Sequence, residues 1–249
     1  MNIRSRQERL DGRAYREFAL KSVARVAPLT EGDAGSIRQA LDAIETSALG
    51  REVIAEGGRL DQPRLLLDGW GIAQRELSDG RRQIFGFVLP GDVYGLCPRP
   101  GGCALYSMIA ATPIVSIPVP FLARALEEGK GALWQFAWTA VAREEAGLRD
   151  QVVRLGRQSA HERLVHLLLE LHFRLKDVGL ANAFDFQFPL SQEVLSDALG
   201  LSVVHTNRTL QQLRRERVIE TRGSHIFLAD IKAMIEMVDF RPPQSLAAA

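Results

Sequence analysis

Cysteine is almost absent from this chain, which has only Cys97 and Cys103 among its 249 residues. Two thiols are too few for the disulfide framework that holds small secreted domains together. The N-terminal sequence MNIRSRQERLDGRAYREF lacks the apolar core of a signal peptide. No run of about 18 apolar residues occurs either, which argues against a membrane-spanning helix. We therefore expect a cytoplasmic protein with no membrane partner.

The chain also lacks an excess of either charge, since 31 basic and 30 acidic residues give a formal net charge of +1. This balance excludes a polybasic or polyacidic protein. It leaves nucleic-acid binding open, because the local distribution of charge matters more than the sum. With 46% hydrophobic residues the chain can bury a sizeable core, and its length fits one large domain or two smaller ones.

The first part of the chain is predicted to be helical. Residues 1–27 are charged and carry apolar side chains at helical spacing, which predicts an amphipathic N-terminal extension. Thr30 then precedes Glu31 and Asp33, the arrangement of an N-cap with acidic residues in the first helical turn. A second helix is therefore expected to begin directly after Thr30.

From about residue 51 the sequence changes to short apolar or alternating runs separated by Gly, Pro and Asp-Gly turns. Asp79-Gly80, between two such runs, is a strong hairpin signal. Strands at this spacing predict an antiparallel β-roll, similar to the jelly roll of cupins, within residues 28–130. An enzyme of the cupin type is an alternative, but it needs histidine metal ligands, and residues 1–160 contain no histidine. We expect no catalysis and no metal site.

A long helix is expected over residues 131–156. The segment from Leu133 to Leu155 has no proline and places apolar side chains at steps of three, four or seven. Its opposite face carries charged residues, among them Arg154. Three aromatic side chains crowd its first turns, where simple packing is the expected role: Trp134, Phe136 and Trp138.

The C-terminal region combines several local signals. Ser191 is expected to cap one helix, Gly200 to end it in the left-handed conformation, and Ser202 to cap the next. Two short strand-like runs, 218–221 and 225–228, follow around a glycine turn. This order is that of a winged helix-turn-helix. The second helix would turn these side chains outwards: Val203, Val204, His205, Asn207, Arg208 and Gln211.

Positive charge is concentrated in the same region. Between His205 and His225 there are five arginines and two acidic residues. Arginine binds phosphates and can donate two hydrogen bonds to guanine in the major groove. A basic helix alone is most simply a solvated surface, but the combination with capped helices, a glycine turn and a hairpin favours DNA binding.

The stretch LSQEVLSDALGLSVVHTNRTLQQLRRERVI resembles the DNA-binding domain of the Crp/Fnr family of bacterial transcription regulators. The order of parts upstream agrees, including DGRRQIFGFVLPGDVYG, and the resemblance covers about residues 28–235. It implies an α+β fold made of an N-terminal helical extension (1–27), a β-roll sensor domain with flanking helices (28–130), a dimerisation helix (131–156) and a winged helix-turn-helix (157–249). It also implies a homodimer, paired through the dimerisation helix, that binds a palindromic operator in double-stranded DNA and can contact RNA polymerase.

By the same resemblance, the base-reading positions fall on Val203, Val204 and Arg208. Many family members carry Arg and Glu at the first two positions, whereas valine offers only apolar contact. Arg208 keeps the option of reading a guanine. Further candidates for contact with bases or phosphates are Ser191, Gln192, Ser202, His205, Asn207 and Gln211.

The effector of the sensor domain is not identified by the sequence. Family members that bind cyclic nucleotides use a Gly-Glu pair and an Arg followed by a small hydroxylated residue. Here Leu96 follows Gly95, and Arg99 lies between two prolines, so cyclic AMP or GMP binding is not expected. The iron–sulfur branch needs N-terminal cysteines, and residues 1–96 contain none, which excludes that cofactor.

The segment CPRPGGC, residues 97–103, leaves alternatives open. Cys97 and Cys103 are able to form a redox disulfide, so a regulator that responds to redox state is one alternative. A cysteine ligand for haem is another, because the roll has no histidine to serve. The simpler interpretation is a pair of partly buried loop cysteines. A further alternative is a sensor domain that has lost ligand binding and serves only for dimerisation or protein contact.

Overall fold

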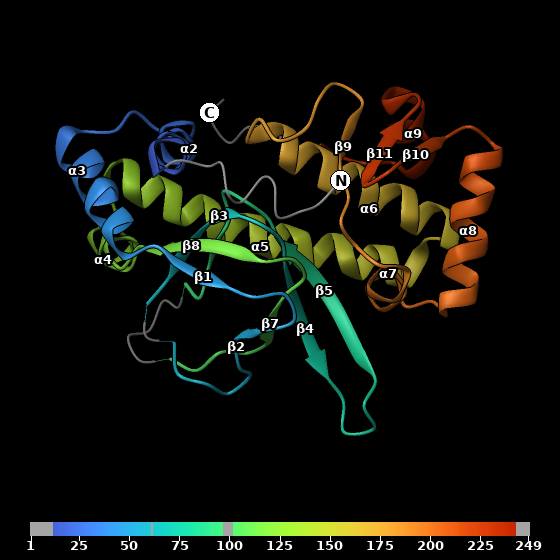
Figure 1. The fold of residues 1–249 in the computed structure, drawn as a ribbon, viewed down its shortest axis with the longest axis horizontal. Helices are drawn as coiled ribbons and strands as arrows, with labels where there is room; N and C mark the ends of the chain where they lie inside the picture. Colours follow the sequence, from blue (N-terminus) through green and yellow to red (C-terminus); the bar gives the residue numbers. More distant parts are fainter. Residues whose placement is uncertain (1–11, 61, 97–101, 243–249) are drawn as a thin grey trace.

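The computed structural model describes residues 12–60, 62–96 and 102–242 (Figure 1). The helices are α2 (Gly12–Ala24), α3 (Glu31–Ala40), the 3-10 helix η1 (Leu41–Ala43), α4 (Phe121–Glu128), α5 (Gly131–Arg157), α6 (Ala160–Asp177), α7 (Gln192–Leu199), α8 (Val203–Arg215) and α9 (Ile231–Val238). The strands are β1 (Glu45–Ser47), β2 (Glu52–Ile54), β3 (Arg64–Asp68), β4 (Gly71–Glu76), β5 (Arg82–Val88), β6 (Val93–Tyr94), β7 (Ser107–Ala110), β8 (Ile114–Pro118), β9 (Asp185–Gln187), β10 (Ile219–Arg222) and β11 (His225–Leu228). This order confirms the expected α+β fold.

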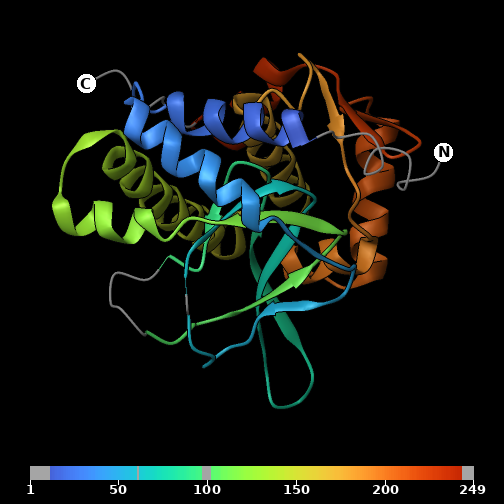
Figure 2. The same cartoon turned by 60° about the vertical axis from the view of Figure 1, so that its left-hand side comes forward.

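The β-roll consists of two four-stranded antiparallel sheets, with strand orders β1-β8-β3-β6 and β2-β7-β4-β5 (Figure 2). Leu66 of β3 packs with Met108 and Ile114 in a cluster that draws residues from both sheets, so this cluster lies between them. Leu65 and Leu67, one position away on either side, belong instead to a cluster with α2 and α5. Successive side chains of β3 therefore point alternately into the space between the two sheets and towards the helices that pack on the outside of the roll.

The predicted hairpin at Asp79-Gly80 is confirmed. Strands β4 and β5 pair antiparallel from Gly71↔Val88 to Glu76↔Arg82. Gly80 has φ of 83°, the left-handed region that glycine enters without strain. The β4–β5 hairpin extends beyond the rest of the roll, as Figure 1 shows.

Local capping signals fix the starts of two helices. Thr30 accepts a hydrogen bond from the amide of Asp33 and donates its own amide to the Asp33 carboxylate, which completes a capping box at α3. Ser159 and Glu162 form the same box at α6. The N-terminal helix begins at Gly12 in the described residues; the part of its prediction that concerns residues 1–11 lies outside them.

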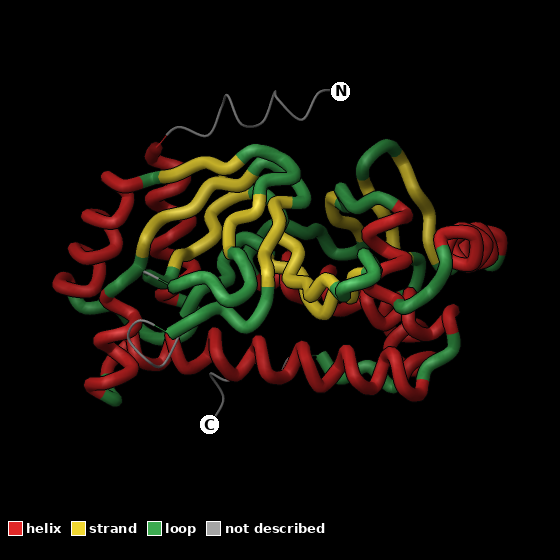
Figure 3. Tube along the Cα trace, turned by 90° about the horizontal axis from the view of Figure 1, so that it is seen from below, coloured by secondary structure: helices red, strands yellow, loops and turns green. Residues whose placement is uncertain are grey.

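Helix α5 confirms the expected long helix and runs along one edge of the molecule (Figure 3). The sequence interpretation of its charged face is wrong for Arg154, whose side chain is only 3% exposed. Arg154 points into the protein because α6 packs on that side and supplies Glu170 as its partner. The apolar Val152, by contrast, is 72% exposed.

The aromatic residues at the start of α5 have different roles. Phe136 is buried against the roll, as predicted. Trp138 is 57% exposed, so the expectation that it packs within the chain is wrong. Its ring stacks on Trp134, with centroids 6.4 Å apart and an interplanar angle of 12°. Both indoles therefore form part of the outer side of α5.

Candidate nucleic-acid interface

Two short helices, α7 and α8, form the predicted helix-turn-helix. The Ser191 hydroxyl accepts a hydrogen bond from the amide of Val194, and the Ser202 hydroxyl accepts one from the amide of His205. Gly200 ends α7 with φ of 63°, in the left-handed conformation expected from the sequence. Both caps and the glycine turn are thus confirmed.

The inner face of α8 is buried against α7 and the helices behind it. Thr206, Thr209, Leu210 and Leu213 are buried. The two leucines pack in one cluster with apolar residues of α7. The shared core holds the two helices together and leaves the other side of α8 free.

The outer face of α8 carries the predicted site residues together. Val204 is 69% exposed, and Val203, His205, Arg208 and Gln211 are exposed as well. Asn207 is half-buried, and its side-chain carbonyl accepts a hydrogen bond from Gln211 Nε2 at 3.0 Å. Figure 1 shows α8 at one end of the molecule, away from the roll. Ser191, Gln192 and Ser202 are exposed at the N-termini of α7 and α8.

Two strands after α8 and one strand before α7 form a three-stranded sheet, the wing. β10 and β11 pair antiparallel and are joined by Gly223-Ser224, and β9 adds a third strand on the other side of β11. Arg222, at the wing tip, lies over the Phe227 ring with its guanidinium carbon 4.9 Å from the ring centroid. Arg214 of α8 donates from Nε to the Thr221 hydroxyl at 2.8 Å, which ties α8 to the wing.

Sequence reasoning missed one anchor of α8. His161 Nε2 lies 2.9 Å from a carboxylate oxygen of Glu216, the residue that ends α8. Gln212 donates to the other oxygen of the same carboxylate. The two partners His161 and Glu216 are 55 positions apart in the sequence, so no local pattern could have indicated the contact.

The interior of the β-roll contains a charged residue that the sequence analysis did not single out. Arg64 donates from Nε to the Ser116 hydroxyl at 3.0 Å and lies 3.2 Å from the Glu45 carboxylate. Tyr94 donates its hydroxyl to Ser116 as well. Burial raises the pKa of Tyr94, although Ser116 and Arg64 act in the opposite direction. This cluster satisfies its own hydrogen bonds.

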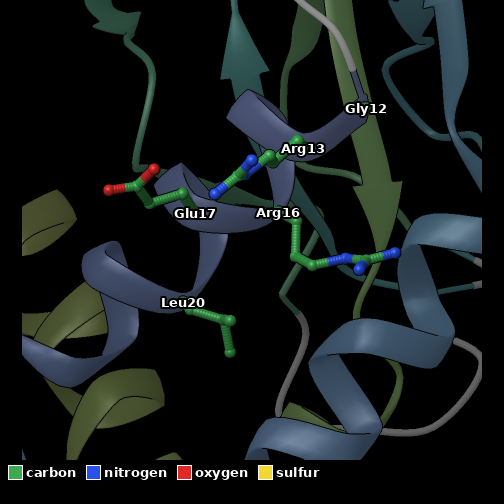
Figure 4. A pocket seen from close by; sticks show the side chains of 5 residues that line it. All are labelled: Gly12, Arg13, Arg16, Glu17 and Leu20. Carbon is green, nitrogen blue, oxygen red and sulfur yellow. The ribbon is translucent and has the colours of Figure 1, made fainter.

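The structure describes only part of the sensor-domain segment that carries the two cysteines. Cys103 is exposed, so the expectation of a partly buried cysteine is wrong at this position, whereas Cys97 and Arg99 lie outside the described residues. Within the described ranges no three His, Cys, Asp or Glu side chains gather in a way that could hold a metal ion. A recess of about 610 Å³ lies on the surface of α2 (Figure 4). Among the described residues, those that line it belong to this helix: Gly12, Arg13, Arg16, Glu17 and Leu20.

The helices of the described part of the chain include none that is long and apolar enough to cross a membrane. Charge is distributed unevenly along α8. The tip of α8 is apolar at Val203 and Val204, while Arg214 and Arg215 occupy its last turn.

Comparison with known proteins agrees with this geometry. Residues 162–237 match the model of the Crp-like helix-turn-helix domain. The nitrogen fixation regulation protein FixK of Bradyrhizobium diazoefficiens is 32% identical over 185 residues, which cover 74% of this chain and 73% of that protein. The transcriptional activator protein FnrL of Cereibacter sphaeroides is 28% identical over 195 residues, covering 75% and 77%.

Among solved structures, FixK2 from Bradyrhizobium japonicum matches with a TM-score of 0.68 and 27% identity, over 78% of this chain and 96% of that chain. The transcriptional regulator TTHB099 of the CRP family from Thermus thermophilus has the same fold, with a TM-score of 0.61 and 21% identity, over 82% of this chain and all of the other. The helix-turn-helix, the roll and these relatives together show that the chain belongs to the Crp/Fnr family of DNA-binding transcription regulators.

Proposed function

We propose that the protein acts as a homodimer on a palindromic operator, with one copy of α8 in each of two successive major grooves. The observation that carries this proposal is a stripe of mostly apolar residues on α5, exposed from Trp138 to Val152 and interrupted by the charged Glu145. It repeats at alternating steps of four and three, which is the heptad pattern of a two-stranded coiled coil. The stripe consists of Trp134, Trp138, Val141, Glu145, Leu148, Val152 and Leu155.

A second copy of this chain is the occupant that the stripe fits best. Val141, Leu148 and Val152 are exposed although each is apolar, and apolar side chains exposed along one face of a helix mark an interaction site. The pattern continues for three heptads on one straight helix, so an identical helix in parallel would match it position for position. Pairing would bring two α8 helices to the same end of the dimer.

We further propose that Arg208 reads a guanine, while Val203 and Val204 make apolar contact with bases, for instance with a thymine methyl. Ser191, Gln192 and Ser202 then bind phosphates, because the free amides at helix N-termini favour anions. His205, Asn207 and Gln211 line the same face and assist. The basic residues that follow, in the last turn of α8 and at the wing tip, supply sequence-independent attraction to phosphates. From the operator, the regulator would act through contact with RNA polymerase.

The sensor domain is proposed to work without a cyclic nucleotide and without an iron–sulfur cluster. Apolar side chains such as Leu66, Met108 and Ile114 fill the space between the two sheets, and Arg64 already has partners there. A redox response through Cys97 and Cys103 is a second candidate, favoured by the exposure of Cys103. Oxidant should then change the DNA affinity of the native protein but not that of the Cys103→Ser variant.

The experiment that tests the main proposal is a selection of bound sequences from random DNA, followed by measurement of mass and salt dependence. We expect a palindromic site whose half-sites lie about one helical turn apart, two chains per site, and an affinity that falls as salt rises. Cyclic AMP should leave the affinity unchanged. A monomer on DNA, or no preference for any sequence, would contradict the proposal.

A further inference from the structure

The last carbonyl groups of a helix have no partner within the helix and must find one elsewhere. At the end of α7 three successive carbonyls are each satisfied by a side chain of a different element. The bonds run from Gln83 Nε2 on β5 to Asp197 O at 2.9 Å, from Gln151 Nε2 on α5 to Ala198 O at 2.7 Å, and from Arg163 Nη1 on α6 to Leu199 O at 3.0 Å. The end of α7 is therefore held from three directions.

Two of these three elements, β5 and α5, lie outside the helix-turn-helix region. β5 belongs to the roll and adds an ion pair to the same contact, since Arg82 Nε lies 2.6 Å from a carboxylate oxygen of Asp197. About one quarter of each side chain is exposed, so water screens the pair only in part. Gln151 also donates to the carbonyl of Ile84 on β5, at 3.2 Å. This one amide thus bridges the roll and α7.

A displacement of α7 would be passed on to α8. The two helices share one apolar core, and only Gly200, Leu201 and Ser202 separate them. The turn itself is closely packed on the long helix, since a Cβ atom at Gly200 would lie 3.1 Å from Leu155 Cδ2. The orientation of the recognition helix relative to the roll is consequently fixed at the end of α7.

We propose that Arg82, Gln83 and Gln151 are positioning residues for DNA recognition, which hold α7, and through it α8, in the orientation that binds the operator. The proposal rests on the proposed function. A recognition helix that is already oriented loses less conformational entropy on binding than one that is free to tilt. Side chains of the roll and of the long helix, none of them on the DNA-binding face, would in this way set the affinity for DNA.

The test compares Arg82→Ala with Arg81→Ala in the full-length protein. Arg81 is adjacent on the same hairpin, and its one ion-pair partner among the described residues is Asp79 within the hairpin loop, so it is a matched control. We expect Arg82→Ala to weaken binding to the selected operator by about five-fold, the range of a partly exposed ion pair with added hydrogen bonds. Arg81→Ala should leave operator affinity unchanged.

A charge exchange and further measurements on Arg82→Ala separate positioning from a purely structural role. The exchange Arg82→Asp with Asp197→Arg reverses the ion pair and should restore operator affinity, which neither single change should do. Arg82→Ala should keep the unfolding midpoint, the dimer mass and the affinity for non-specific DNA of the wild type. Amide hydrogen exchange at residues 197–201 should be faster in this variant, because the restraint on the end of α7 is gone.

Equal operator affinities of Arg82→Ala and Arg81→Ala would overturn the proposal, and so would tighter binding by Arg82→Ala. Should Arg82→Ala fold poorly, the operator affinities of Gln83→Ala and Gln151→Leu are compared with that of Arg81→Ala instead. The test is distinct from that of the proposed function. A wild-type protein that selects no operator refutes the proposed function, whereas a wild-type protein that binds while Arg82→Ala binds equally well refutes only the positioning role.

Discussion

The guanidinium of Arg154 and the carboxylate of Glu170 are joined in the interior of the protein, with only 3% and 13% of their side chains exposed. Glu170 also accepts a hydrogen bond from Arg174, which in turn pairs with Asp92 in the turn after β5. Arg154, Glu170, Arg174 and Asp92 thus form a chain of ion pairs with alternating charge, which runs from α5 through α6 to the roll. Burial alone would raise the pKa of Glu170, but the two arginines hold it below its ordinary value.

Removal of the Glu170 charge should therefore be costly. Glu170→Gln leaves the buried Arg154 without its ion-pair partner, while the partly exposed Arg174 keeps Asp92. We expect the free energy of unfolding to fall by about 3 kcal/mol, the cost of removing one partner of a buried ion pair. Urea denaturation measures this loss. Glu236→Gln, on the exposed side of α9, is the control and should change stability by less than about 0.5 kcal/mol. A loss below 1 kcal/mol for Glu170→Gln would contradict the assignment.

Stability should also fall in mild acid because of His166. Burial and the nearby Arg154 lower the pKa of His166 to about 4, and Arg154 donates to its Nδ1, so the folded protein keeps this imidazole neutral. The unfolded chain takes up a proton near pH 6.5. The free energy of unfolding should thus decrease as pH falls from about 6.5 to about 4, by at most about 1.4 kcal/mol per pH unit from this residue.

Urea titrations at several pH values check this dependence against a His166→Gln variant. Glutamine keeps a hydrogen-bond acceptor for Arg154 but cannot be protonated, so its stability should depend less on pH between 4 and 6.5. The pKa of His172 is also lowered, chiefly by burial, and His172 will leave a residual slope in both proteins. Equal slopes for wild type and variant would show that His166 is not the group responsible.

Glu145 should weaken the dimer that we propose. It is the one charged residue in the apolar stripe of α5 and would face its own copy near the middle of a parallel pair. Its carboxylate binds Arg149 on the same helix at 2.7 Å, which offsets part of the repulsion. We expect Glu145→Leu to lower the dimer dissociation constant at least about ten-fold.

Sedimentation analysis over a range of protein concentrations measures that constant. Glu236→Leu adds the same apolar side chain on α9 and should leave it unchanged. Weaker dimerisation of Glu145→Leu would mean that the stripe does not pair with itself in parallel.

Arg208 and Arg215 should contribute differently to DNA binding, although both lie on α8. Arg208→Ala is expected to weaken operator binding by about 1–3 kcal/mol and to relax the preference at one base pair of each half-site. Arg215→Ala should weaken binding to all sequences alike and make the salt dependence less steep. Competition binding with single-base operator variants distinguishes the two, and an unchanged site preference for Arg208→Ala would remove its assignment as a base reader.

The features that the sequence predicted correctly depend on neighbours along the chain. The caps at Thr30, Ser191 and Ser202, the left-handed Gly200 and the hairpin at Asp79-Gly80 are each determined within about four residues. Such interactions use the same few residue types wherever they occur, so they can be recognised without knowledge of the fold.

The features that it did not predict depend on distant partners. The helical spacing of α5 indicates two faces, but it does not tell which one meets the rest of the chain, and so Arg154 and Trp138 were assigned to the wrong surroundings. The bridge made by Gln151 joins positions 67 and 47 residues away.

The two ends of α8 differ in charge. Its exposed tip, Val203 and Val204, carries no charge, whereas Arg214 and Arg215 occupy its last turn. In the complex that we propose, bases are read from the N-terminal half of α8, Val203 to Arg208, whereas the last turn contributes attraction to phosphates. Substitutions at Val203 and Val204 would then redirect the regulator to other operators and leave the contribution of Arg214 and Arg215 in place, so new target genes would be accessible through one or two changes.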